Sequence, residues 1–198
     1  MDGFLLVDKP AGATSHDMVA RVRAALREAG VRGPAKGGRV RVGHAGTLDP
    51  FATGLLVVLL GRATRAQRHV MALRKAYEVV ARFGAVSTTG DRDGEITQTG
   101  RLPQGDLALP TGEVRQVPPA HSAVKVGGRR AYALARAGEE VRLPPRTVRV
   151  WRFDELWRSD PAQPPRRAYA IECSSGTYVR SLVAERGDAY SEELRRPP

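Results

Sequence analysis

Residues 43–54 read Gly-His-Ala-Gly-Thr-Leu-Asp-Pro-Phe-Ala-Thr-Gly, and they lead into the most apolar run of the chain, Leu-Leu-Val-Val-Leu-Leu at 55–60. An apolar run this short, bounded by glycines, predicts a buried strand rather than a helix. Asp49 precedes Pro50, which keeps the aspartate backbone out of the helical region. A carboxylate at the start of a buried strand can act as a nucleophile or a base, whereas an Asp-Pro pair can also be a plain turn.

Outward from this segment, strands and helices are interspersed without a regular βαβ rhythm. Apolar residues repeat at helical spacing over 15–29, between a Thr-Ser N-cap and Gly30. Apolar and polar residues alternate over 75–83, which predicts a half-buried strand. The remaining predictions are strands at 4–7, 55–60, 146–156 and 167–174, tight turns at 90–94 and 127–128, and helices at 64–73, 131–137 and from 177 onward. This pattern predicts an α+β fold with a mixed, mainly antiparallel sheet flanked by helices.

Composition narrows the class of partner. The chain has 198 residues, with 32 Lys and Arg against 21 Asp and Glu, a formal net charge of +11. This surplus indicates a polyanionic partner, nucleic acid first and an acidic membrane surface second, although a generally basic surface would give the same balance. The single cysteine excludes an intramolecular disulfide framework and a Cys-based zinc site. No pair of histidines has metal-ligand spacing, so no metal is expected. With no signal peptide or membrane span, a cytoplasmic location is expected.

The segment at 43–54 resembles the catalytic signature of the TruB family of tRNA pseudouridine-55 synthases. Other blocks resemble further motifs of that family in the same order along the chain. These blocks are 6–15, 75–77, 89–94, 116–125, 175–180 and 194–196. The resemblance implies a pseudouridine synthase fold in one catalytic domain over 1–198, with an active-site cleft and a basic RNA-gripping insertion at about 118–147. It also leads us to expect that the C-terminal RNA-binding domain of the family is absent.

The same resemblance implies an isomerase that converts uridine 55 of the tRNA T-loop to pseudouridine by base flipping and an essential aspartate. It implies tRNA as the partner, no cofactor and a monomer. The alternative is a catalytically weak or inactive RNA-binding or RNA-folding protein on the same scaffold. The presence of Asp49, Tyr77 and Arg180 favours the enzyme.

The resemblance assigns roles residue by residue. Asp49 is the catalytic carboxylate, Tyr77 stacks on the flipped base, and Arg180 pairs with Asp49 and keeps it ionised. Whether Asp49 attacks C1′, attacks the base or removes a ribose proton is left open. The expected substrate-binding residues are His44, Tyr178, Lys9 and Leu194. The expected contacts to the RNA backbone are Lys125, Arg129, Arg130, Arg136, Arg142 and Arg146, for which a solvated basic face is the alternative.

Overall fold

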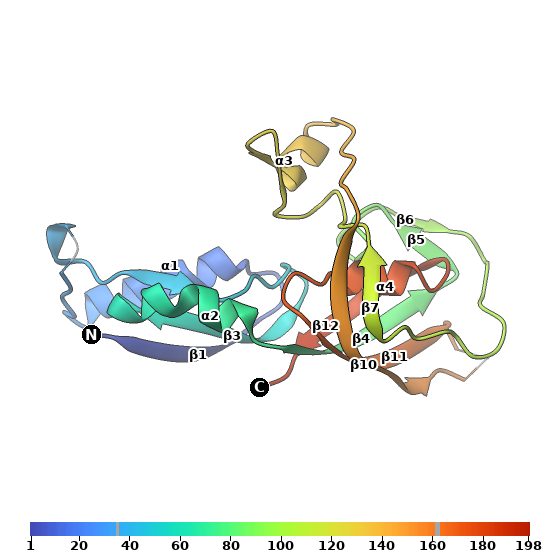
Figure 1. Cartoon of the computed structure of the whole chain (residues 1–198), viewed down its shortest axis with the longest axis horizontal. Coiled ribbons are helices and arrows are strands. Elements are labelled where there is room, and N and C mark those ends of the chain that lie inside the picture. The colour runs from blue at the N-terminus through green and yellow to red at the C-terminus, as the bar shows by residue number, and fades with distance from the viewer. Residues whose placement is uncertain (35, 161–162) are drawn as a thin grey trace. The chain divides into compact units, whose positions relative to one another are not determined.

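The computed structural model describes residues 1–34, 36–160 and 163–198 (Figure 1). The chain forms two compact units, Met1–Lys75 with Arg195–Pro198, and Ala76–Leu194. The single domain expected over 1–198 from the sequence stays a prediction. In the part of the chain described, no helix is long and apolar enough to cross a membrane.

The first unit is built around the predicted apolar strand. Its elements are β1 (Gly3–Lys9), α1 (Ser15–Glu28), the 3-10 turn η1 (Lys36–Gly38), β2 (Val42–His44), β3 (Thr53–Leu60), the 3-10 turn η2 (Gly61–Ala66) and α2 (Gln67–Ala72). Strand β3 pairs antiparallel with both β1 and β2. The last two residues of β12 (Ala189–Arg196) pair in parallel with Thr53 and Gly54 at its start. The predicted strand at 55–60 is confirmed, because it is the central strand of this unit.

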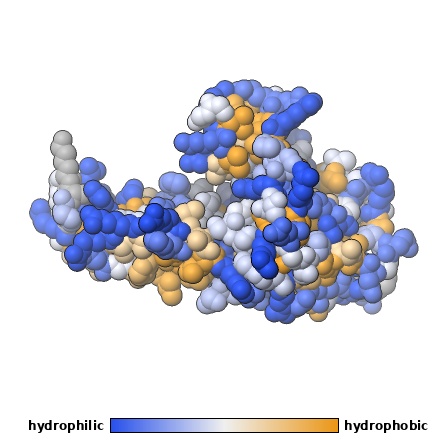
Figure 2. Space-filling model, viewed as in Figure 1, coloured by the Kyte–Doolittle hydropathy of each residue, from blue (hydrophilic) through white to orange (hydrophobic). Residues whose placement is uncertain are grey.

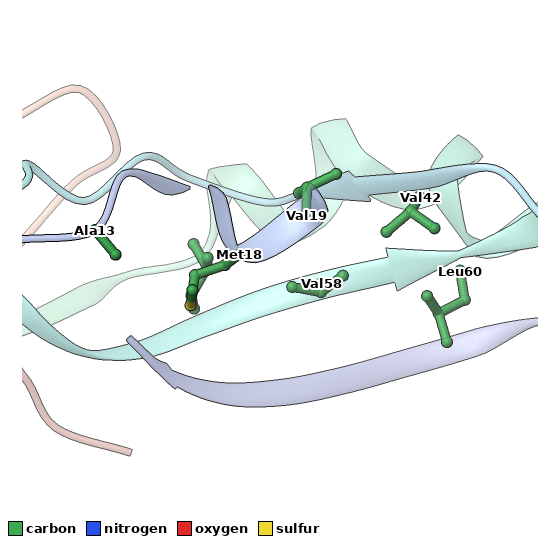
Figure 3. Packing of buried hydrophobic residues seen from close by; sticks show 7 residues of the cluster. Ala13, Met18, Val19, Val42, Val58 and Leu60 are labelled. Carbon is green, nitrogen blue, oxygen red and sulfur yellow. The ribbon is translucent and has the colours of Figure 1, made fainter. Parts of the chain in front are cut away.

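Helix α1 covers one face of this small sheet. Thr14 and Asp17 form a reciprocal capping box at its start, in which each side chain accepts a backbone N–H of the other. The helix turns its apolar side toward β3, and the core gathers between them (Figure 3). The buried members of this cluster are Ala13, Met18, Val19, Val42, Leu56, Val58 and Leu60. The helix predicted from apolar spacing is therefore confirmed.

The second unit contains the larger part of the sheet. Its elements are β4 (Lys75–Phe83), β5 (Ala85–Ser87), β6 (Ile96–Gln98), β7 (Gly112–Gln116), β8 (Lys125–Val126), β9 (Arg129–Arg130), α3 (Ala131–Arg136), β10 (Arg146–Arg158), β11 (Arg166–Cys173), α4 (Val179–Ala184) and β12. The strand order is β12-β4-β11-β10-β7, and β11–β10 and β10–β7 are antiparallel. The alternation in β4 buries Tyr77, Val79, Ala81 and Phe83, as predicted.

The end of the chain departs from the prediction of a closing helix from 177 onward. Helix α4 ends at Ala184, and β12 follows it. The sequence Ser-Glu-Glu-Leu-Arg-Arg at 191–196 has good intrinsic helix propensity. However, Ala189, Tyr190 and Ser191 are buried in the sheet, and the Ser191 N–H donates to the Gly90 carbonyl at 3.0 Å. Pairing with neighbours distant in sequence therefore overrides the local preference.

A segment of the second unit projects from this sheet. It contains the β8–β9 hairpin and α3, and Figure 1 shows it standing out from the strands of the unit. Gly127 and Gly128 form the hairpin turn with φ of 56° and 83°, the left-handed region that a two-residue turn of this kind requires. The predicted turn at 127–128 and the short helix after it are confirmed. The predicted mixed, mainly antiparallel sheet is confirmed as well, and few helices accompany it.

Candidate active site

Asp49 is half-buried in the loop between β2 and β3, and the residues on both sides of it are held by buried groups. Before it, the Ser15 hydroxyl accepts the Leu48 N–H at 2.9 Å and donates to the Leu48 carbonyl at 3.2 Å. After it, the Pro50 carbonyl accepts the Gly12 N–H at 2.9 Å. Ser15 and Leu48 are each 2% exposed, so the two hydrogen bonds between them are shielded from water. The loop therefore presents the carboxylate from a braced backbone.

Lys9 braces the same loop from the end of β1. Its side chain is fully buried, and Nζ donates to the carbonyl oxygens of Pro10, Ala13 and Pro50 at 2.9, 2.7 and 3.1 Å. A buried ammonium is tolerated when its donors are satisfied in this way. The sequence led us to expect Lys9 to bind substrate. In this structure Lys9 holds the backbone beside Asp49, and its contact with substrate stays a prediction.

Arg196 is a further brace that sequence reasoning passed over. It is 6% exposed, and its guanidinium donates to the Thr47 and Leu55 carbonyls, both at 3.3 Å. Gly54 lies against it with φ of 102°, and a Cβ there would collide with the Arg196 carbonyl. The signal was present, because Arg196 closes the Leu-Arg-Arg block at 194–196.

His44 is half-buried at the end of β2, in the unit that carries Asp49. Its ring lies edge-on to that of His16, with 5.4 Å between the ring centroids. Burial holds the pKa of His44 below its ordinary value, and the nearby positive charge of His16 lowers it further. These effects favour the neutral imidazole of His44 over the charged one. Its contact with substrate stays a prediction.

Tyr77, Tyr178 and Arg180 lie in the second unit, on β4 and at the start of α4. Arg180 is 3% exposed, and its guanidinium donates to the carbonyls of Thr89 and His121 at 2.6 and 3.0 Å. Its predicted pairing with Asp49 joins residues of different units and stays a prediction. Leu194 is buried in β12, and its contact with substrate also stays a prediction.

Asp91 is an ion-pair partner of Arg180 that the sequence reasoning did not identify. The Arg180 Nη1 to Asp91 Oδ2 distance is 3.1 Å, and both side chains are buried. Asp91 also accepts the Thr89 hydroxyl at 2.6 Å and the Asp93 N–H at 3.0 Å. The sequence shows the acidic turn at 89–94 as a family motif but assigns no role to Asp91. Its structural consequence is a buried carboxylate that aligns the guanidinium of Arg180.

The predicted RNA-gripping residues fall into two groups. Lys125, Arg129 and Arg130 are exposed on the β8–β9 hairpin, and Arg136 and Arg142 are exposed nearby. Figure 2 shows hydrophilic side chains around a small hydrophobic group on this projecting segment. Arg146 forms the second group. It is half-buried, and its guanidinium lies 4.6 Å from the Tyr178 ring centroid.

Within the described ranges, no group of three or more His, Cys, Asp and Glu side chains is placed to hold a metal ion. The first unit offers a braced carboxylate, and the second offers aromatic rings and a buried guanidinium group.

Comparison with known proteins identifies the family. Residues 35–179 match the model of the TruB family pseudouridylate synthase, N terminal domain. The chain is 44% identical to tRNA pseudouridine synthase B of Nocardia farcinica and 47% identical to that of Leifsonia xyli, over 96% and 93% of its length. It spans 60% and 61% of these two relatives.

The fold agrees with this match. A chain in a crystal structure of a Cbf5–Nop10–Gar1 complex superposes with a TM-score of 0.64 at 26% identity, over 98% of this chain and 47% of that one. The pseudouridine synthase fold expected from the sequence is therefore confirmed. On the family match and the sequence identities together, this chain belongs to the TruB family of pseudouridylate synthases.

Proposed function

We propose that this chain isomerises uridine 55 in the T-loop of tRNA to pseudouridine. The observation that carries the proposal is the braced loop, in which Ser15, Lys9 and Arg196 hold the backbone around a half-buried Asp49. Such bracing fixes the position of a carboxylate before the substrate arrives, which is how a site lowers the cost of reaching a transition state. The relatives of this chain are named tRNA pseudouridine synthase B, which supports the same activity.

The reaction breaks the N1–C1′ bond, turns the base and joins C5 to C1′. The proton on C5 leaves and N1 gains one, so no atom is lost overall and no redox partner is needed. Asp49 supplies the carboxylate, by attack on C1′, by attack on the base or by removal of a ribose proton. Arg180, aligned by Asp91, keeps that carboxylate ionised. Tyr77 stacks on the base and Tyr178 lines the uracil pocket.

Reaching the target atom requires extrusion of the nucleotide from the T-loop stack, at a cost of a few kcal/mol. The exposed cations of the projecting segment offset this cost by binding phosphates. Lys125, Arg129 and Arg130 are suited to this role, because they lie together on one exposed hairpin. His44 and Leu194 contact the substrate near the flipped base. The protein acts as a monomer in the cytoplasm.

The direct test uses an unmodified tRNA transcript and the purified chain, with pseudouridine mapped at nucleotide resolution. We expect conversion at position 55, and no conversion in a matched transcript that carries cytidine there. The Asp49→Asn variant serves as the inactive control. Tight binding of tRNA without conversion by the parental chain would contradict the proposal and would favour an RNA-binding or RNA-folding protein.

A further inference from the structure

Gln116 is a buried glutamine whose side-chain amide makes two hydrogen bonds to the backbone of Tyr178. It is 1% exposed at the end of β7, and its Oε1 accepts the Tyr178 N–H at 2.7 Å. Its Nε2 donates to the Tyr178 carbonyl at 3.3 Å. Tyr178 has extended backbone angles, φ −101° and ψ 106°. The side chain thus gives Tyr178 the two hydrogen bonds that a neighbouring strand would give it.

Arg146 holds the same tyrosine by its ring. The guanidinium carbon lies 4.6 Å from the Tyr178 ring centroid, within the range of a cation–π contact. Its Nε and Nη2 are buried and have no hydrogen-bond partner among the residues that the structure describes. A guanidinium buried in this way is held by the ring rather than by carboxylates. The contact therefore restricts how the Tyr178 ring can turn.

The two residues that hold Tyr178 are themselves partners. Gln116 and Arg146 face each other in the antiparallel pairing of β7 with β10. Cross-strand partners project to the same face of a sheet, so both side chains reach the same neighbour. All of the chain between them, residues 117–145, leaves and returns at this pair. The two residues at the base of the projecting segment are therefore the same two that contact Tyr178.

The same end of β7 is tied to α4 a second time. The Ser181 hydroxyl donates to the Val117 carbonyl at 2.7 Å. Helix α4 has no side-chain cap at Tyr178, so the contacts from β7 define where it starts. Arg180 is in the first turn of that helix. A displacement of Tyr178 would therefore be passed to Arg180 as well.

We propose that Gln116 and Arg146 are positioning residues that clamp Tyr178, Gln116 by its backbone and Arg146 by its ring. The proposal rests on the proposed function for its catalytic consequence, since Tyr178 is expected to line the uracil pocket. It replaces the phosphate contact predicted for Arg146 with a contact to Tyr178. A displaced ring would slow conversion, because errors of about 1 Å in a site can cost roughly 100-fold in rate.

The experiment observes Tyr178 without relying on activity. The full chain is labelled with 3-fluorotyrosine, and the Tyr178 fluorine resonance is the one lost in Tyr178→Phe. We expect this resonance to shift and broaden in Gln116→Met and in Arg146→Met. The matched control is Gln98→Met, at an exposed glutamine of β6, which should leave it unchanged. An unchanged Tyr178 resonance in folded Gln116→Met and Arg146→Met would overturn the clamp.

The catalytic consequence is read separately. At saturating tRNA, single-turnover conversion by Gln116→Met should fall roughly 10- to 100-fold, whereas the Kd for tRNA should stay within about 3-fold. Gln116→Glu keeps the acceptor and should recover part of the rate. Equal conversion by the parent and Gln116→Met would overturn the positioning role. A parent that does not convert tRNA would refute the proposed function, and the fluorine spectra would still decide the clamp. If Gln116→Met does not fold, the Tyr178 fluorine spectrum of Arg146→Met alone decides whether the clamp exists.

Discussion

The Asp49 loop and the segment at 118–147 both contain glycine or proline and both lack long regular elements, yet the Asp49 loop and the β8–β9 hairpin of the segment differ in burial. In the loop, Ala45, Leu48, Phe51 and Ala52 are each at most 3% exposed. In the segment, every residue of the β8–β9 hairpin is exposed. The Asp49 loop is therefore embedded in a core, whereas in the segment the hairpin meets solvent and Ala131, Leu134 and Leu143 are buried.

The polar contacts differ in the same way. The backbone of the loop is held by buried donors, of which Lys9 and Arg196 carry full charges. In the projecting segment, Arg129 pairs with Glu139 and Arg142 pairs with Glu140, and all four side chains are mostly exposed. Exposed pairs of this kind contribute little to stability. The difference teaches that the proposed catalytic carboxylate lies on a stretch braced by buried contacts, whereas the proposed RNA contacts lie on a stretch whose ion pairs are exposed.

The largest expected effect is on the carboxylate itself. Asp49→Asn keeps the size of the side chain but removes its charge and nucleophilicity. We expect single-turnover conversion of tRNA to fall by about three orders of magnitude or more, with thermal unfolding unchanged. Equilibrium binding of tRNA should persist, because the exposed cations lie on the other segment. Near-normal conversion by this variant would return Asp49 to the role of a turn residue.

The second prediction tests the rigidity of the loop. Lys9→Met removes the donor of three hydrogen bonds, of which the one to the Ala13 carbonyl is buried and those to Pro10 and Pro50 are partly buried. Because an unsatisfied buried group costs about 1–3 kcal/mol, we expect the free energy of unfolding in urea to fall by about 1–3 kcal/mol. Lys125→Met, at an exposed lysine of the hairpin, should change it by less than about 0.5 kcal/mol. Equal effects of the two changes would refute the contrast between the two stretches.

The third prediction concerns the exposed segment. Neutralising Arg129 and Arg130 together should weaken tRNA binding and reduce the slope of log K against log salt by about two, roughly one for each phosphate contact. Thermal unfolding should hardly change, since the ion pair of Arg129 with Glu139 is exposed. The measurement is a set of binding titrations at several salt concentrations. A slope identical to that of the parent would remove the hairpin from the RNA-binding surface.

The smallest effect is the pH dependence of stability at His44. Burial, and secondarily the charge of His16, lower the pKa of His44 below its ordinary value of 6.5. The unfolded state therefore binds more protons between the two pKa values, and stability falls as pH drops below about 6.5. His44→Gln should flatten that fall in denaturation measured across this range. His69→Gln, at an exposed histidine of α2, is the control and should leave the pH dependence as in the parent.

Much of the fold followed from local pattern. The apolar spacing and the Thr14 cap placed α1, and strict alternation placed β4 with its buried face. The glycine pair placed the hairpin turn at 127–128. These features are decided within a few residues, by capping, side-chain periodicity and turn geometry. The candidate reactive residues also came from sequence, because the motif blocks in order matched one family.

Tertiary structure alone decided the contacts that join distant parts of the chain. Strand β12 has a sequence suited to a helix, and sheet pairing makes it a strand. The partner of Arg180 at Asp91 and that of Tyr178 at Gln116 are remote in sequence. Lysine is usually exposed, and local sequence gives no sign that Lys9 is buried. Its burial is explained by the three carbonyl oxygens that accept its hydrogen bonds. Such contacts depend on which elements pack together, and no local propensity encodes that choice.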